Sequence, residues 1–130
     1  MAYYLDTSAL VKLVVAELET PALMAWLTAA DRAPVSCDLA RTELLRAVRR
    51  VAPHRAVQAR TVLDSVTLVE VSTAMFEEAG RLEPALLRSL DAVHLAAALA
   101  LGDDLEGLVT YDERLADAAE INGLPVTAPE

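Results

Sequence analysis

Short runs of aliphatic and β-branched residues alternate along this chain with longer segments whose apolar residues recur every three or four positions. This alternation is typical of a parallel sheet with helices on both faces. It predicts strands over residues 2–5, 33–36, 67–71, 108–110 and 125–127. It predicts helices over residues 8–15, 21–30, 39–51, 55–64, 74–82, 90–101 and 113–121, with Gly102, Gly107 and Gly123 as stop signals beside these elements. We therefore expect an α/β fold with a mostly parallel sheet of about five strands.

Length and composition fit one domain. A chain of 130 residues, 55% of them hydrophobic, can bury one core and needs no second domain, so we expect a single domain over residues 1–130. The longest apolar run, residues 95–101, is too short to cross a membrane, and Asp6 precedes any possible signal-peptide core. We expect a cytoplasmic protein. The single cysteine, Cys37, cannot form an intramolecular disulfide and is expected in the core.

The charge is strongly negative overall but unevenly distributed. A formal net charge of −9 argues against a protein that holds nucleic acid by bulk electrostatics, because phosphate binding depends on Lys and Arg. Residues 41–60 are an exception, since Glu43 is the only acid there. The basic residues of this stretch are Arg41, Arg46, Arg49, Arg50, Arg55 and Arg60. They form either a solvated helical face or a basic patch, and the acidic remainder equally suits a basic protein partner.

Two aspartates follow predicted strands. Asp6 closes the first strand, and Asp112 lies just beyond the strand over residues 108–110. In an open α/β sheet the functional crevice lies outside the carboxyl ends of the strands, so both side chains are placed for a site there. Each is also a favourable N-cap for the helix that follows, and capping explains either residue taken alone.

Two further acids lie within predicted helices. Glu43 borders the apolar stripe of its helix, where it either reaches a site or pairs locally with Arg46 or Arg50. Asp91 lies in the first turn of its helix, where the helix dipole favours an anion. Ser89 is the candidate cap of that helix.

Four carboxylates in one pocket would have to take up protons or hold a cation, because each pair repels by roughly 4 kcal/mol at ~4 Å and an effective dielectric of ~20. Mg²⁺ and Mn²⁺ prefer carboxylate oxygens, whereas zinc would need His or Cys. The two histidines, His54 and His94, are not in a ligand pattern, and His94 is expected to be a neighbour of the site or a helix-surface residue. A bound divalent ion activates water and neutralises phosphoryl charge, so phosphodiester hydrolysis is the natural reaction.

Other classes of phosphoryl chemistry fit less well. Phosphatases of the haloacid dehalogenase type need an Asp-x-Asp-x-Thr segment, whereas Thr-Ser-Ala follows Asp6. Response-regulator receivers need a late lysine, and the only lysine is Lys12. No glycine-rich phosphate loop is present. A Ser-His-Asp triad that uses Ser8 and His94 stays open, although nothing local supports it.

Four segments together resemble the PIN-domain family, in particular the VapC toxins of bacterial toxin–antitoxin pairs. They are residues 5–11 (LDTSALV), 41–47 (RTELLRA), 89–96 (SLDAVHLA) and 108–112 (LVTYD), and they span nearly the whole chain. Each motif is weak alone, but four in this order and at these separations are specific. The resemblance implies a three-layer α/β/α sandwich whose acids hold Mg²⁺ or Mn²⁺ and cleave RNA. One departure is that Glu113 follows the fourth motif, where an aromatic residue is frequent.

The resemblance assigns the chemistry to the same acids. Carried over residue by residue, the metal-binding and catalytic residues, which we call the acidic quartet, are Asp6, Glu43, Asp91 and Asp112. Asp6 and Asp91 are expected to be the principal metal ligands, and one of the other two positions or deprotonates the attacking water. The supporting polar positions are Thr7, Ser8 and Thr110. The residues expected to guide the RNA backbone are Arg46, Arg49, Arg50 and Arg55.

The resemblance also implies partners. They are a second copy of the chain, in a homodimer, and a VapB-like antitoxin whose basic tail lies across the toxin. Two alternatives stay open: a catalytically silent PIN-like module that only binds another protein, and a solitary RNA-processing nuclease without an antitoxin. The intact acidic quartet disfavours the silent module, because crowded carboxylates without a cation cost stability.

Overall fold

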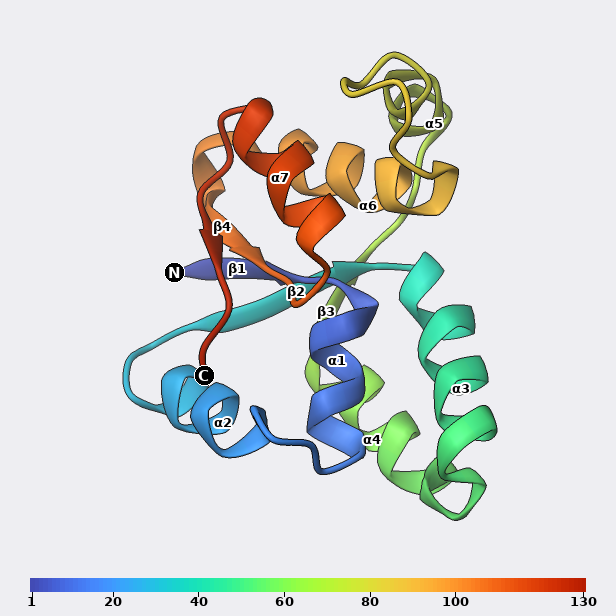
Figure 1. The fold of residues 1–130 in the computed structure, drawn as a ribbon, viewed down its shortest axis with the longest axis vertical. Coiled ribbons are helices and arrows are strands. Elements are labelled where there is room, and N and C mark those ends of the chain that lie inside the picture. Colours follow the sequence, from blue (N-terminus) through green and yellow to red (C-terminus); the bar gives the residue numbers. More distant parts are fainter.

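The computed structural model describes residues 1–130, and its centre is one five-stranded parallel sheet (Figure 1). The strands are β1 (Ala2–Leu5), β2 (Ala33–Cys37), β3 (Thr67–Val69), β4 (Leu105–Val109) and β5 (Val126–Thr127). Their spatial order is β3-β2-β1-β4-β5, and all pairs are parallel. The expectation of a parallel α/β sheet with five strands is confirmed.

Seven α-helices cover the two faces of the sheet, so the molecule has three layers (Figure 1). They are α1 (Thr7–Val14), α2 (Thr20–Thr28), α3 (Leu39–Val51), α4 (Ala56–Ser65), α5 (Thr73–Ala79), α6 (Ser89–Ala100) and α7 (Glu113–Ile121), with short 3₁₀ helices η1 (Pro53–Arg55) and η2 (Gly102–Asp104). Helices α1 to α4 lie on one face, and α5, α6 and α7 lie on the other. None of these helices is long and apolar enough to cross a membrane.

Successive side chains of a strand point to opposite faces of the sheet, so the hydrophobic core is divided between the two helical layers. In β1 the side chain of Leu5 joins the cluster beneath α1 and α3, whereas that of Tyr4 joins the cluster beneath α6 and α7. Val109 and Leu108 in β4 divide in the same way. All four side chains are fully buried. The central pair β1 and β4 is therefore fixed from both faces, and the loops that leave these strands start from a rigid base.

Four predicted boundaries are wrong by two or three residues. The fourth strand begins at Leu105 and ends at Val109, so Gly107 lies inside it rather than before it. A Cβ atom on Gly107 would lie 2.9 Å from the carbonyl oxygen of Pro125, so glycine here permits close approach to the segment that enters β5. The other three differences are that α2 ends at Thr28, β3 at Val69 and α5 at Ala79. Gly102 and Gly123 do stop their elements, each with a positive φ.

The strand order places a topological switch point between β1 and β4. Chain connections leave β1 towards β2 and β3 on one side, whereas β4 and β5 lie on the other side. In open parallel sheets the crevice at the carboxyl ends of two such strands is the usual site of ligand binding. Asp6 follows β1 directly, and Asp112 follows β4 within three residues. Both acids therefore lie at this crevice, where we expected the functional site from the sequence.

Candidate active site

Asp6 is buried at the carboxyl end of β1 and is held by three hydrogen-bond donors. Its Oδ1 accepts from the backbone N–H of Ala9 at 3.1 Å and from Oγ of Ser8 at 2.6 Å, and its Oδ2 accepts from Oγ1 of Thr110 at 2.6 Å. The residue is only 4% exposed. Burial raises the pKa of Asp6 above its ordinary value, although the three donors oppose the rise. Asp6 is thus both an N-cap and a carboxylate fixed at the switch point.

Thr110 connects the ends of the two central strands. Besides donating to Asp6, its Oγ1 accepts from the backbone N–H of Asp112 at 3.1 Å. Oγ of Ser8 in turn accepts from the backbone N–H of Tyr111 at 3.0 Å. Asp112 caps α7, because its Oδ1 accepts from the backbone N–H groups of the next helical turn. These two hydroxyls link the ends of β1 and β4, where the two strand-end acids lie.

Glu43 contacts a buried histidine rather than a neighbouring arginine. Its Oε1 lies 2.5 Å from Nε2 of His94 and accepts from Oγ1 of Thr7 at 2.7 Å. Neither Arg46 nor Arg50 pairs with it, so the local-pair alternative is wrong. His94 is 2% exposed, so its placement on the helix surface is also wrong, whereas its placement as a neighbour of the site is correct.

Both ring nitrogens of His94 are engaged. Nδ1 lies 2.7 Å from the hydroxyl of Tyr4 and 3.8 Å from Sγ of Cys37, which is fully buried as expected. Burial alone lowers the pKa of His94, but its contacts with Cys37 and Glu43 outweigh burial and raise the pKa to about 10. Burial opposes ionisation of Glu43, yet the contact with His94 leaves its pKa below the ordinary value. His94 and Glu43 therefore form a charged pair at neutral pH.

The remaining two acids share one arginine. Nε of Arg88 lies 3.3 Å from Oδ2 of Asp91, and Nη2 of Arg88 lies 3.5 Å from Oδ2 of Asp112. Burial and repulsion from Asp112 raise the pKa of Asp91, and the attraction of Arg88 does not cancel them. Ser89 is the first residue of α6 and makes no capping hydrogen bond, so its assignment as the cap is wrong.

The quartet is gathered at one edge of the sheet without forming a ready-made metal cage. No three His, Cys, Asp or Glu side chains of the chain stand together as ligands of one ion. Asp91 and Asp112 nevertheless repel each other and already share a cation, and a pocket of about 330 Å³ opens beside Glu43 and Asp91. Mg²⁺ needs only one or two carboxylates in addition to water and substrate phosphate. An oxygen-only donor set with unbalanced negative charge fits such an ion.

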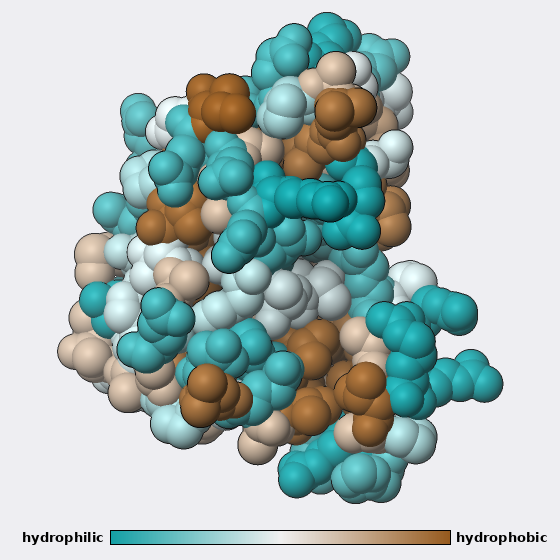
Figure 2. Space-filling model, in the orientation of Figure 1, coloured by the Kyte–Doolittle hydropathy of each residue, from teal (hydrophilic) through white to brown (hydrophobic).

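The arginines expected to guide RNA lie on one helix and its end. Arg46, Arg49 and Arg50 are exposed on α3, Arg55 is exposed in η1, and none of them makes an ion pair. Helix α3 starts at the carboxyl end of β2 and runs away from the sheet (Figure 1), and hydrophilic side chains project outward over it (Figure 2). The structure thus places these arginines on the flank of the molecule.

One site residue, Arg88, was missed from the sequence. The contact of Arg88 with Asp91 is an i, i+3 pair on the first turn of α6, and this spacing was a signal that could have found it. The His94 contacts join positions 4, 37, 43 and 94, for which the sequence carried no local signal. A Ser8–His94 triad does not form, because His94 is held by Tyr4 and Glu43.

The sequence of this chain is similar to that of known proteins from one family. A model of the PIN domain family matches residues 3–121. Ribonuclease VapC46 of Mycobacterium tuberculosis is 45% identical over 129 residues, which are 98% of each chain. Ribonuclease VapC35 of the same species is 42% identical and covers 97% of this chain and 96% of its own.

Solved structures show the same fold at lower identity. One is Mycobacterium tuberculosis VapC20, described as a Sarcin-Ricin loop cleaving toxin, with a TM-score of 0.76 and 16% identity over 98% of this chain and 99% of the other. Another is VapBC2 from Rickettsia felis bound to a DNA fragment from its promoter, with a TM-score of 0.70 and 18% identity over all of both chains.

The raised pKa of His94 predicts a pH-dependent stability. Protonated His94 stabilises the fold fully below its ordinary pKa of 6.5, and this contribution is lost as the pH rises towards about 10. His94→Gln should therefore lower the free energy of unfolding by about 2 kcal/mol at pH 6 and by less at pH 10. Urea unfolding of metal-free protein measures both values, with the exposed His54→Gln as the control. An equal loss at the two pH values would contradict the charged pair.

Proposed function

Because the chain belongs to the PIN-domain family and matches VapC ribonucleases along nearly its whole length, we propose that it is a Mg²⁺-dependent endoribonuclease. It hydrolyses phosphodiester bonds of RNA and acts as the toxin of a VapBC-type toxin–antitoxin system. The observation that carries the proposal is that Asp91 and Asp112 repel each other and share Arg88, with Glu43 lining the same pocket as Asp91 and Asp6 linked to Asp112 through Thr110. Mn²⁺ has the same ligand preference and is an alternative cofactor.

The four acids have different contacts and therefore different roles. Asp91 and Asp112 repel each other and are bridged only by the exposed Arg88, which a metal can displace, and Asp6 completes the ligand set from β1. A bound divalent ion would lower the pKa of a water and neutralise charge on the phosphate. Glu43 stays ionised and is fixed by His94 and Thr7, so it can accept a hydrogen bond from the attacking water and orient it.

Ser8 and Thr110 act as positioning residues. Their hydroxyl groups donate hydrogen bonds to the two carboxylate oxygens of Asp6, and these bonds fix the plane of that carboxylate. A carboxylate whose orientation is set before the reaction needs no reorganisation when charge develops. The exposed arginines of α3 and η1 would attract the RNA backbone from the flank of the molecule, without reading its sequence.

The partners are proposed from the relatives. A VapB-like antitoxin neutralises the toxin in the cytoplasm, and the protein forms a homodimer. Solved structures of the same fold include a toxin–antitoxin complex from Klebsiella pneumoniae, with a TM-score of 0.71 and 22% identity. The excess of acidic residues suits a basic segment of such an antitoxin.

Asp6→Asn tests the catalytic assignment. The amide is close in size and can still accept from Ala9, so the fold should persist, whereas one negative charge is lost at the proposed metal. RNA cleavage in Mg²⁺ should fall by at least about 10²-fold, as for loss of a group that stabilises developing charge. Cleavage of total RNA, with mapping of new 5′ ends, measures the loss.

Asp64→Asn is the matched control, because Asp64 is exposed on α4 and its replacement should leave cleavage unchanged. Removal of metal with EDTA should abolish cleavage by the wild-type protein, and added Mg²⁺ should restore it. Wild-type cleavage that survives EDTA, or Asp6→Asn protein that cuts RNA at the wild-type rate, would overturn the proposal.

Arg88→Gln should tighten metal binding in the absence of RNA. The arginine competes for Asp91 and Asp112, but it is largely exposed, so the competition is worth about 0.2–1 kcal/mol. Isothermal titration with Mg²⁺ should therefore show an affinity about 1.4- to fivefold higher than that of the wild type. Arg81→Gln, which breaks an exposed pair with Glu78, is the control and should not change it. Weaker Mg²⁺ binding by Arg88→Gln would contradict a shared site.

A further inference from the structure

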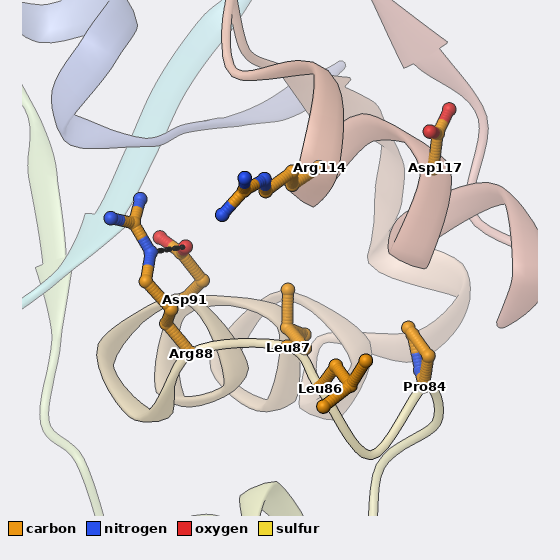
Figure 3. A pocket seen from close by; sticks show the side chains of 7 residues that line it. All are labelled: Pro84, Leu86, Leu87, Arg88, Asp91, Arg114 and Asp117. Atoms are coloured by element: carbon orange, nitrogen blue, oxygen red, sulfur yellow. Dashed lines mark hydrogen bonds and ion pairs between the residues drawn. The ribbon is translucent and has the colours of Figure 1, made fainter.

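A second pocket opens beside the acidic quartet, on the far side of Asp91. It has a volume of about 180 Å³ and lies between the segment that precedes α6 and the first turns of α7 (Figure 3). Its wall includes Leu86, Leu87, Arg88, Asp91, Arg114 and Asp117. Asp91 lines this pocket and also the pocket next to Glu43, so the two cavities meet at one proposed metal ligand.

Two arginines from separate elements flank this pocket. Arg114 extends from α7 towards Asp91, and its guanidinium makes no ion pair (Figure 3). Arg88 stands at the border between the pocket and the quartet, where it contacts Asp91 and Asp112. The carboxylate of Asp117 points away from both guanidinium groups. In a chain with a net charge of −9, a free arginine aimed at an acidic site is suited to an anion that arrives with the substrate.

The opposite wall is apolar and accessible. Leu86 is 95% exposed, so it contributes almost nothing to the core, whereas Leu87 packs partly against the cluster beneath α6. Figure 2 shows hydrophobic surface between α7 and the segment before α6, bordered by hydrophilic side chains. An apolar wall opposite two arginines matches a nucleotide, which joins an apolar-faced base to a phosphate.

We propose that this pocket is a subsite for one unpaired nucleotide of the RNA, adjacent to the phosphate that is cleaved. This inference rests on the proposed ribonuclease function, and it describes how the active site would hold its RNA substrate. Arg114 binds the backbone phosphate of this nucleotide, and the base packs against Leu86. Arg88 contacts the phosphate that joins the subsite to the quartet. A single concave pocket favours an unpaired base, because the bases of a duplex are stacked and cannot enter it.

Binding of a labelled RNA to the full chain tests the subsite. The parent protein carries Asp6→Asn so that Mg²⁺ can be present without cleavage, and the probe is a fluorescein-labelled single-stranded RNA of mixed sequence. Arg114→Gln should raise the Kd about tenfold and reduce the slope of log Kd against log salt by about one, because one phosphate contact is lost. Leu86→Ala should raise the Kd about threefold at every salt concentration without changing the slope.

Two controls separate the subsite from general electrostatics. Arg60→Gln removes the same charge from α4, which lies on the other face of the sheet, and should raise the Kd by no more than about twofold. Annealing the probe to its complement should remove the effect of Leu86→Ala. Because Leu86 and Arg114 are exposed, both variants should keep the melting temperature and the Mg²⁺ affinity of the parent.

The outcomes distinguish the subsite from the function on which it rests. Wild-type protein that cleaves RNA, together with Arg114→Gln and Leu86→Ala variants that bind like the parent, would overturn the subsite alone. The same follows if Arg114→Gln weakens binding no more than Arg60→Gln does. Absence of both RNA binding and Mg²⁺-dependent cleavage in the unmodified protein would overturn the proposed function and the subsite with it.

Discussion

Repulsion between carboxylates at one edge of the sheet is the constraint on which the rest of this site depends. The four acids of the quartet are compensated in three ways. Asp6 is held by hydroxyl and backbone donors, Glu43 by a buried histidine, and the remaining two acids by Arg88. Only the last arrangement uses a cation that is exposed and able to move away. The metal proposed for this protein would therefore bind at the two acids that Arg88 now bridges, and it would displace that arginine.

Sheet topology makes this crowding possible. The quartet is spread over more than a hundred positions of sequence, yet β1 and β4 are neighbours, and their carboxyl ends bring the first and last acids to one crevice. Helices α3 and α6 supply the other two from opposite faces of the sheet. The hydrogen bond from Thr110 to Asp6 joins the two strand ends directly, and the charged pair of His94 and Glu43 joins the two helical layers.

The parallel sheet and the strand-end acids could be anticipated because they depend on local pattern and on the general geometry of parallel sheets. Glu43 could be singled out as an acid beside an apolar stripe and through the resemblance to the family. Its true partner, His94, could not be found, since a buried polar pair depends on which helices meet in three dimensions and not on spacing along one of them. The interior place of Gly107 was missed for the same reason: the carbonyl group that requires a glycine there belongs to a distant segment.

Binding of the metal by the two acids that Arg88 bridges can be tested with a crystal soaked in Mn²⁺ and measured at the manganese absorption edge. We expect an anomalous peak within coordination distance of Asp91 and Asp112, with the guanidinium of Arg88 displaced from both carboxylates. A peak remote from the quartet, or no peak while Arg88 still bridges the two aspartates, would contradict it.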